Sequence, residues 1–387
     1  MKDPPRHVDH LVIGGGPAGA MAAIRMAEAG RQVMLVEKES GPHHKVCGEF
    51  LSREAIGYLH SVSIFPEKLG GKNLSRVRLS SASRMVESAL PFYALSLSRR
   101  ALDEAMLARA VAAGCEVQRG AAVESLARNG TGWLVQLSSG KQIAARAVFL
   151  ASGKHDLRGW NRGPGTHSDL VGFKLHFRLS SAETEVLRES TELFLFPGGY
   201  GGLVLVENQA TNLCLVVRRA ELRYQGGWTQ LLARLLVVNH HLGQRLRGAE
   251  QLYARPLAIS PIPYGYLSAG SDGVWRVGDQ AAVIPSFTGD GISIALHSAS
   301  LAADMCLRGR SADEYTLTLR RHLQASMPLA TGLSRAMVAA PGQALAPAVL
   351  SLVPNAMRWI AAATRVPEAR LLHAASAFAH PGSSFTD

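Results

Sequence analysis

The sequence predicts an α/β (α+β) chain with one mixed α/β domain, one antiparallel β-sheet domain and a set of C-terminal helices. Residues 8–37 pass from a strand-like segment through a glycine-rich turn into a helix-like segment and a second strand. Residues 171–217 are strand-like, and the stretches 173–179 and 191–196 within them alternate apolar and polar side chains, which is the two-residue period of a β-strand. Residues 311–375 are helical in composition. Together these three observations predict the fold class.

The composition excludes several classes of protein. Lys and Arg outnumber Asp and Glu by 41 to 30, but the excess lies in isolated pairs, without a long basic run, so we expect no nucleic-acid partner. The four cysteines are widely spaced and include no CxxC pair, which argues against a disulfide framework and a zinc site; we expect no metal. The first residues lack the apolar core of a signal peptide, so the expected location is the cytoplasm.

The turn at residues 14–19 has the form GxGxxG and joins the first strand to the first helix. Gly14 permits the tight turn, Gly16 lets the backbone approach a pyrophosphate, and Gly19 lets the helix pack closely on the strand. The free N–H groups of the helix N-terminus point at the phosphates. Glu37 ends the second strand, 18 residues after Gly19, where a carboxylate can accept hydrogen bonds from a ribose diol. The pattern predicts a Rossmann-like nucleotide-binding domain.

A second motif near the end of the chain joins a strand end, a loop and the start of a helix. Its residues are Gly278, Asp279, Pro285, Gly289, Asp290, Gly291 and Ile292. In this pattern the chain resembles the superfamily of FAD enzymes that contains p-hydroxybenzoate hydroxylase and geranylgeranyl reductase. The resemblance implies FAD as the cofactor, with Asp279 bonded to its ribityl chain and the amides of 289–292 facing the flavin pyrimidine edge. Helix N-terminal amides would stabilise the anion of the reduced flavin.

Further residues complete the predicted cofactor site. Residues 97–103 resemble the superfamily's R-x-x-L-D segment, whose arginine approaches the phosphates, and the spacing favours Arg99 over Arg100. The remaining cofactor-binding candidates are Ala18, Lys38, Lys45 and Val123.

One segment departs from the resemblance. Hydroxylases of the superfamily carry an Asp-Gly dipeptide after the strand that returns the chain to the FAD, and this dipeptide is tied to the use of NAD(P)H. Here residues 151–158 read Ala-Ser-Gly-Lys-His-Asp-Leu-Arg, where Asp156 and Arg158 are the candidates to replace part of it. NAD(P)H is therefore a candidate electron donor whose direct reaction we expect to be inefficient. The G-W-x-W-x-I-P motif of the flavin halogenases is also missing, which argues against halogenation.

A cysteine loop favours the reductase branch of the superfamily. Residues 45–51 read Lys-Val-Cys-Gly-Glu-Phe-Leu, and geranylgeranyl reductase-like flavoproteins have a comparable Cys-Gly loop that approaches the flavin face. Cys47 and Gly48 are the candidate catalytic residues, because a thiol there could donate a proton or position a reducible double bond. The nearby His43, His44 and Lys45 would favour the thiolate. The alternative role of Cys47 is that of a buried structural cysteine.

The strand-rich residues form the predicted substrate side, since a sheet of this kind covers the flavin in the superfamily. Its inner face would be rich in Phe, Leu and Val, which favours a small apolar or aromatic substrate. Phe196 and Tyr200 are the candidate pocket residues, and a plain hairpin turn at 198–202 is the alternative for the latter. The expected division is a discontinuous FAD-binding domain of residues 1–75, 96–170 and 265–320, a β-sheet substrate domain of residues 76–95 and 171–264, and a helical segment of residues 321–387.

The helical segment also bears on membrane contact. About 22 uncharged residues separate Arg335 from Arg358, close to the length of a membrane span. Prolines and polar residues interrupt them, which favours packed helices. Arg358, Trp359 and Arg365 would allow peripheral membrane contact.

The leading prediction is an FAD-dependent oxidoreductase that reduces, or forms, a carbon–carbon double bond in a small, largely apolar substrate. The alternative within the superfamily is an FAD-dependent monooxygenase that hydroxylates an aromatic or polyketide-type substrate through a flavin hydroperoxide. The alternative of another class is a non-catalytic flavin- or lipid-binding protein, against which the intact second motif argues. The sequence sets neither the substrate nor the oligomeric state.

Overall fold

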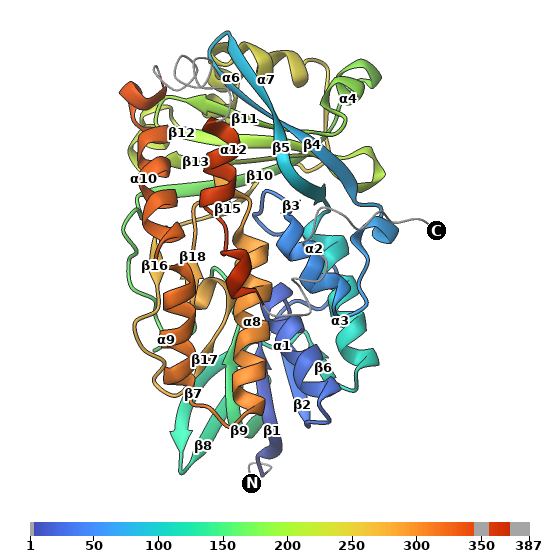
Figure 1. Cartoon of the computed structure of the whole chain (residues 1–387), viewed down its shortest axis with the longest axis vertical. Helices are drawn as coiled ribbons and strands as arrows, with labels where there is room; N and C mark the ends of the chain where they lie inside the picture. The colour runs from blue at the N-terminus through green and yellow to red at the C-terminus, as the bar shows by residue number, and fades with distance from the viewer. Residues whose placement is uncertain (1–3, 344–355, 372–387) are drawn as a thin grey trace.

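The computed structural model describes residues 4–343 and 356–371, and it has one large β-sheet towards each end of the molecule, with helices beside both (Figure 1). This arrangement confirms the predicted fold class. Residues 344–355 and 372–387 of the predicted C-terminal segment lie outside the described residues.

The first sheet has seven strands in the order β6-β2-β1-β9-β8-β7, with β17 also paired to β9. Strands β1, β2, β6, β9 and β17 are parallel, and the hairpin β7–β8 is joined to β9 in the antiparallel sense. The strands are β1 Arg6–Ile13, β2 Val33–Glu37, β6 Glu116–Arg119, β7 Val123–Asn129, β8 Gly132–Leu137, β9 Gln142–Leu150 and β17 Trp275–Arg276.

Helices cover the first sheet and form the largest core of the protein. The helix α1 packs against both α3 and α8, and α2 packs against α8. These helices are α1 Pro17–Glu28, α2 Arg53–His60, α3 Arg99–Ala112 and α8 Gly291–Leu307. The helix α1 begins at Pro17, because proline is well suited to the first position of a helix.

The second sheet has nine strands in the order β14-β10-β13-β12-β11-β4-β5-β3, with β15 also paired to β10. All its pairs are antiparallel except β4 with β11, so the sheet is mixed where an antiparallel one was expected. The strands are β3 Phe50–Leu51, β4 Lys72–Ser81, β5 Arg84–Ser96, β10 Leu170–Arg178, β11 Ser190–Phe196, β12 Gly199–Leu205, β13 Thr211–Arg218, β14 Glu250–Gln251 and β15 Leu257–Ile259. A small separate pair joins β16 Tyr266–Leu267 to β18 Ala282–Val283.

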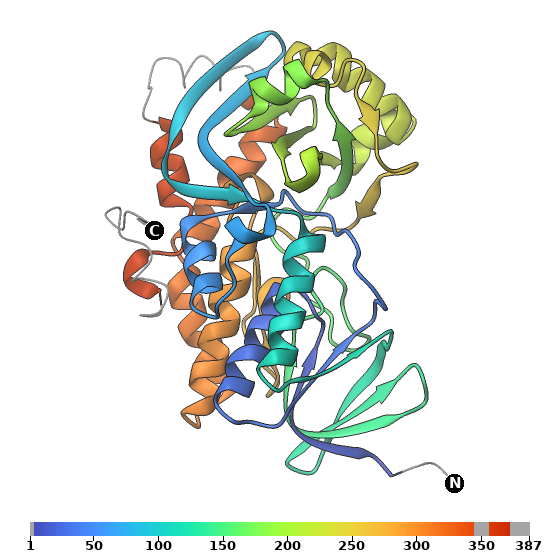
Figure 2. The same ribbon diagram turned by 90° about the vertical axis from the view of Figure 1, so that its right-hand side faces the viewer.

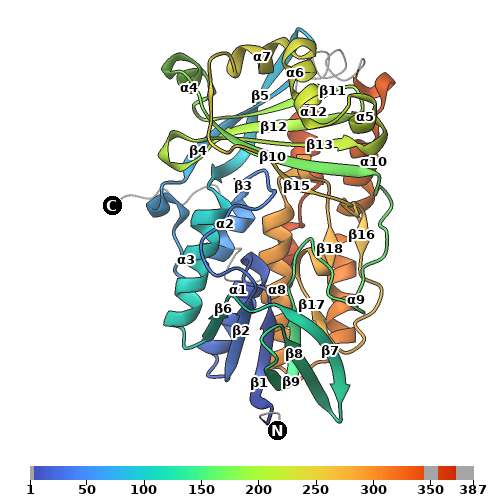
Figure 3. The same cartoon turned by 180° about the vertical axis from the view of Figure 1, so that it is seen from behind.

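The second sheet has two different faces. One face packs on a group of short helices seen at the upper edge of Figure 3, where the apolar side chains of β10 to β13 form a separate core with Leu231, Leu235 and Leu242. These helices are α4 Ser181–Leu187, α5 Arg219–Tyr224, α6 Trp228–Val238 and α7 His240–Arg245. The helices α6 and α7 are separated at Asn239, whose side chain caps α7. The other face is turned towards the first sheet.

The last helices run along one side of the molecule and connect its two ends (Figure 2). They are α9 Ala312–Leu323, α10 Ser326–Val338 and α12 Ala356–Ala363. The helix α9 packs on α8, α10 contacts β11 and β12, and α12 contacts β5. Within residues 4–343 and 356–371, no helix combines the length and the apolar character that crossing a bilayer requires.

Candidate functional site

Two helix N-termini open into one cavity of about 500 Å³ between the two sheets. The helix α1 begins after Gly16 and α8 begins after Asp290, and in neither does a side chain cap the first amides. Gly16, Ala18, Gly291 and Ile292 line the cavity. Because uncapped N-termini carry partial positive charge and unpaired N–H groups, the cavity suits a ligand with two separate anionic parts.

The β1–α1 turn is tight enough to exclude side chains at two of its glycines. A Cβ on Gly19 would lie 1.9 Å from the Gly14 carbonyl oxygen, and a Cβ on Gly14, whose φ is 108°, would lie 2.4 Å from the Ala151 carbonyl oxygen. Glycine is required at both places, since any other residue would overlap backbone atoms. The Gly19 side of the helix therefore faces the strand, while the Gly16 side is open to the cavity.

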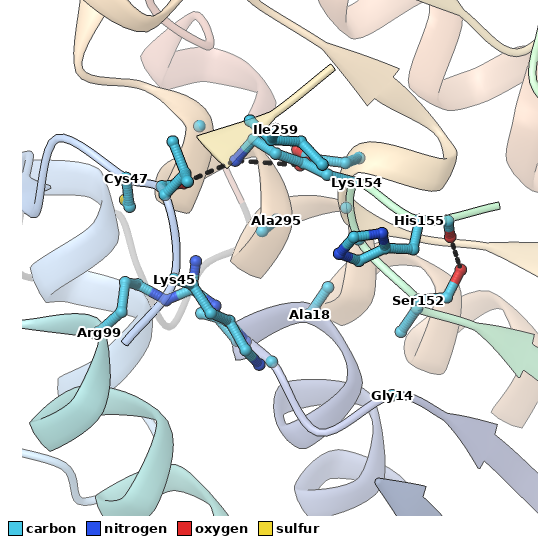
Figure 4. A pocket seen from close by; sticks show the side chains of 18 of the residues that line it. Gly14, Ala18, Lys45, Cys47, Arg99, Ser152, Lys154, His155, Ile259 and Ala295 are labelled. Atoms are coloured by element: carbon cyan, nitrogen blue, oxygen red, sulfur yellow. Dashed lines mark hydrogen bonds and ion pairs between the residues drawn. The ribbon is translucent and has the colours of Figure 1, made fainter. Parts of the chain in front are cut away.

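Two cations converge on Gly16. The Arg99 guanidinium and the Lys45 ammonium lie 3.3 and 4.0 Å from the point where a Cβ on Gly16 would stand. Asp103 orients both, at 2.8 Å from Arg99 Nε and 3.2 Å from Lys45 Nζ. Although burial alone would lower it, the pKa of Arg99 is raised by the Asp103 carboxylate, so the guanidinium stays charged. Figure 4 shows both cations above the start of α1, a position from which they could bind a diphosphate.

The far end of the cavity carries a buried carboxylate. Glu37 is 4% exposed, and it accepts hydrogen bonds from the amides of Gly15 at 2.6 Å and Glu39 at 3.1 Å. Lys38 and Val123 line the same end. These bonds hold the carboxylate beside the β1–α1 turn, and this position fits the predicted contact with a ribose diol.

The segment after β9 supplies side chains that the sequence patterns did not single out. Lys154 Nζ lies 3.6 Å from the Asp279 carboxylate and donates to the Val46 carbonyl oxygen at 3.0 Å (Figure 4). Arg162 donates to the Asp279 carbonyl oxygen at 3.0 Å and to Asp156 at 2.7 Å. In the sequence, the feature that could have indicated these side chains is the polar run within residues 151–158 that replaces the Asp-Gly dipeptide. Asp156 lines the cavity, but Arg158 does not.

Most of the predicted site residues meet in this one cavity. Its lining includes Gly14, Gly16, Ala18, Glu37, Lys38, Lys45, Cys47, Gly48, Arg99, Val123, Gly278, Asp279, Gly289, Gly291 and Ile292. Gly19 and Pro285 lie outside the lining, in the backbone that shapes it.

The Asp290 side chain does not reach the cavity. It is fully buried and lies 3.1 Å from Arg365 Nη1, which also binds Glu54 at 2.8 Å. Burial raises the pKa of Asp290 to about 7, against the lowering effect of Arg365. The expectation that Asp290 joins the cofactor site is therefore corrected: its side chain points into the protein, where it pairs with Arg365.

A second cavity of about 390 Å³ adjoins the first and is almost wholly apolar. The two share Gly48, Phe50, Cys214, Ser286 and Gly289. The second cavity lies against the inner face of β4, β5, β11 and β12 and is closed by α10 and α12; among its described lining residues Arg365 is the single charged one. The Cys47–Gly48 turn, the loop segment formed by these two residues, therefore lies where the first cavity, the candidate cofactor cavity, opens into an apolar space.

The structure places the two predicted pocket residues on opposite faces of the second sheet. Tyr200 lines the apolar cavity and contacts Ser334 Oγ at 3.2 Å. It lies inside β12 rather than in a flexible turn, since the strand begins at Gly199. Phe196 is a correction, because it packs beside Phe194 in the core under α6 and α7, on the opposite face of the sheet. Side chains alternate along β11, so Leu193 and Leu195 face the cavity instead.

Comparisons with known proteins agree with this geometry. Residues 7–153 match the family described as an FAD binding domain. The chain is 26% identical to a menaquinone reductase of Mycobacterium tuberculosis (strain CDC 1551 / Oshkosh) over 77% of this chain and 76% of the relative. It is also 26% identical to a digeranylgeranylglycerophospholipid reductase 2 of Methanopyrus kandleri over 82% and 81%. The flavin-dependent brominase Bmp2 has a similar fold, with a TM-score of 0.75, 16% identity and coverage of 96% and 97%.

Proposed function

We propose that this FAD-dependent oxidoreductase, which belongs to the superfamily that contains p-hydroxybenzoate hydroxylase and the geranylgeranyl reductases, reduces a carbon–carbon double bond in a largely apolar substrate. Its membership of the superfamily rests on the FAD-binding domain, the related reductases and the shared fold. The observation that carries the reaction is the junction at Gly48 and Gly289, where the Cys47–Gly48 turn meets the apolar cavity.

The proposed FAD site uses the residues that already meet in the larger cavity. The α1 N-terminus, Arg99 and Lys45 would hold the diphosphate, and Glu37 would hold the adenosine ribose. Asp279, next to Lys154, would hold the ribityl chain. Reduced flavin supplies two electrons as a hydride to an electrophilic carbon. The uncapped α8 N-terminus would stabilise its negative charge.

The apolar cavity supports a substrate with a long hydrocarbon part. Side chains such as Val77, Leu79, Leu193 and Leu195 line it, and burial of such a chain is favourable at about 25 cal/mol per Å² of apolar surface. The relatives' names specify menaquinone and a digeranylgeranylglycerophospholipid. We propose that the substrate here likewise presents an unsaturated apolar chain to the junction.

Balance of the reaction requires a proton as well as a hydride. The hydride adds to one carbon of the double bond, and the other carbon must receive a proton. We assign this proton to the Cys47 thiol, which lines the cofactor cavity beside the junction. Water would then return a proton to the thiolate, and the net change is the addition of two electrons and two protons to the substrate.

NAD(P)H is the proposed source of electrons. The segment that replaces the Asp-Gly dipeptide holds Asp156 against Arg162 and Gln280. In the superfamily's hydroxylases the missing dipeptide is tied to the use of NAD(P)H. Because it is replaced here, we expect NADPH and NADH to reduce the bound flavin slowly when mixed directly with the protein under anaerobic conditions. Bleaching of the flavin absorbance measures that rate, with dithionite as the positive control.

The proposal extends to where the substrate enters. The helix α12 lines the apolar cavity with Met357 and Ile360 and presents Trp359, 66% exposed, beside the exposed Arg358. A chain of net charge +11 is attracted to an anionic bilayer, and tryptophan favours the interface. We propose peripheral contact through α12. Co-sedimentation with phosphatidylglycerol vesicles, but not with phosphatidylcholine vesicles, should require Trp359, and an equally bound Trp359→Ala variant would contradict this role.

The reaction is tested by product analysis. The FAD-loaded protein is reduced with dithionite without oxygen and mixed with a digeranylgeranylglycerol lipid or a menaquinone in detergent. We expect flavin reoxidation together with a product two mass units heavier per double bond reduced. The Cys47→Ser variant should bind FAD normally but form this product at least tenfold more slowly. Reoxidation by neither acceptor, or an unaffected Cys47→Ser variant, would contradict the proposal or the role of Cys47, respectively.

A further inference from the structure

Glu49 follows the Cys47–Gly48 turn in a backbone conformation that is unusual for a glutamate. Its φ is 59°, in the left-handed region that side chains with a Cβ rarely adopt, and the residue is fully buried. Such a conformation persists only where the surrounding contacts determine it. Glu49 is also tied to the turn itself, because its amide donates to Cys47 Sγ at 3.4 Å.

The Glu49 carboxylate has three partners from two separate elements. Lys174, also fully buried, binds Oε1, and His176 Nε2 lies 2.9 Å from Oε2. The backbone amide of Arg99, at the start of α3, donates to Oε1 at 2.8 Å. Burial alone would raise the pKa of Glu49, but the Lys174 ammonium and the His176 hydrogen bond outweigh it and lower the pKa to about 2. These partners therefore favour the ionised form of the carboxylate.

Besides its contact with Glu49, the second sheet also binds the Cys47–Gly48 turn directly, through Asn212. Lys174 and His176 lie on β10, directly opposite Cys214 and Asn212 of β13, so the four side chains share one face of the sheet. Asn212 Nδ2 donates to the Cys47 carbonyl oxygen at 3.0 Å. The sheet thus fixes the turn through the carbonyl of Cys47 and through the carboxylate of Glu49.

The same group of atoms is poorly suited to a metal ion. His44, Glu49 and His176 each offer a ligand atom, and these atoms lie within 4.8 Å of one another. However, the Lys174 ammonium already contacts the carboxylate and is itself inaccessible to water. A divalent cation beside a buried ammonium would meet strong repulsion. The second ring nitrogen of His176 is taken by the Tyr253 hydroxyl at 2.8 Å. The contacts are those of a fixed support.

We propose that Glu49 is a positioning residue, whose buried pairing with Lys174 and His176 holds the Cys47–Gly48 turn at the junction of the two cavities. The inference rests on the proposed function for its catalytic meaning, because the turn sets where the thiol and the double bond meet the flavin. Its structural content, the placement of Cys47, can be measured without any substrate.

The test compares Glu49→Gln with a matched control. Glu192→Gln removes the charge of another buried glutamate, 5% exposed, which pairs with Arg78 and Arg245. In the FAD-loaded proteins, iodoacetamide labelling of Cys47 is followed at the peptide level by mass spectrometry. We expect Glu49→Gln to label at least tenfold faster than the unchanged protein and to lower kcat/KM for the reductase substrate at least tenfold. Glu192→Gln should label within twofold of the unchanged protein.

A second variant separates the support of the turn from general instability. Glu49→Gln leaves the Lys174 ammonium buried without its partner, whereas Glu49→Gln with Lys174→Met removes both charges. The double variant should regain thermal stability but keep the fast labelling of Cys47. Labelling within twofold of the unchanged protein in the folded double variant would overturn the proposal. Altered labelling in a protein that reduces no double bond would instead contradict the proposed function alone.

Discussion

The substitution Gly19→Ala is the sharpest test of the predicted nucleotide-binding turn between β1 and α1. A Cβ at this position would lie 1.9 Å from the Gly14 carbonyl oxygen and 3.1 Å from the Ala151 Cβ. Non-bonded carbon and oxygen atoms need more than about 3 Å, so α1 would have to move away from β1 by about 1 Å, and overpacking of this kind costs about 1–3 kcal/mol. The same shift would carry the uncapped N-terminus and Gly16 away from Arg99 and Lys45.

The assay is the FAD content of the purified protein together with its thermal midpoint. We expect Gly19→Ala to lose most of its FAD and to unfold about 1–4 °C lower, because a cost of about 1–3 kcal/mol shifts the midpoint of a 387-residue chain by this amount. The matched control is Gly332→Ala in α10, which is also a helical glycine but has open space around the new Cβ. It should be neutral or slightly stabilising, since alanine favours a helix. A Gly19→Ala protein with full FAD and an unchanged midpoint would refute the reasoning.

Three further predictions concern single side chains. Leu193→Trp should raise KM for a long-chain substrate at least tenfold with FAD binding unchanged, because Leu193 lines the apolar cavity; an unchanged KM would contradict that role. Glu37→Gln should weaken FAD binding by about tenfold or more in a fluorescence titration, since hydrogen bonds to a charged group are worth about 1.5–3 kcal/mol. The pKa of Asp290 is raised to about 7, so its contribution to stability is present below about pH 4 and is lost as pH rises through 7. The thermal midpoint of Asp290→Asn should therefore decline less between pH 5 and pH 8 than that of the unchanged protein, and parallel profiles would argue against the shift.

The cofactor side of the site could be predicted because its chemistry is local in the sequence. The turn at 14–19 and the motif at 278–292 each carry their own spacing, and both reach the cavity as expected. Spacing favoured Arg99 over Arg100, and of these two residues only Arg99 lines the cavity. Where a motif fixes the backbone, the sequence is informative about the site.

The substrate side was harder to predict because it depends on strand phase and long-range contacts. Phe196 and Leu195 are neighbours, yet only one can face the cavity, and both suit a buried strand equally. The pairing of Glu49 with Lys174 joins positions 125 residues apart, and no local pattern indicates it. Asp290 lies in a predicted motif, but its direction depends on Arg365, which follows 75 residues later.

The central claim is that reduced flavin in this protein passes its electrons to a double bond rather than to oxygen for hydroxylation. Stopped-flow spectroscopy of the dithionite-reduced protein tests it directly, with dissolved oxygen in one mixing experiment and an unsaturated lipid or quinone acceptor in the other. We predict slow, direct reoxidation by oxygen and faster reoxidation by the acceptor. An oxygen adduct of the flavin that persists for a second or more, together with no reaction with the acceptor, would contradict the claim and favour the monooxygenase.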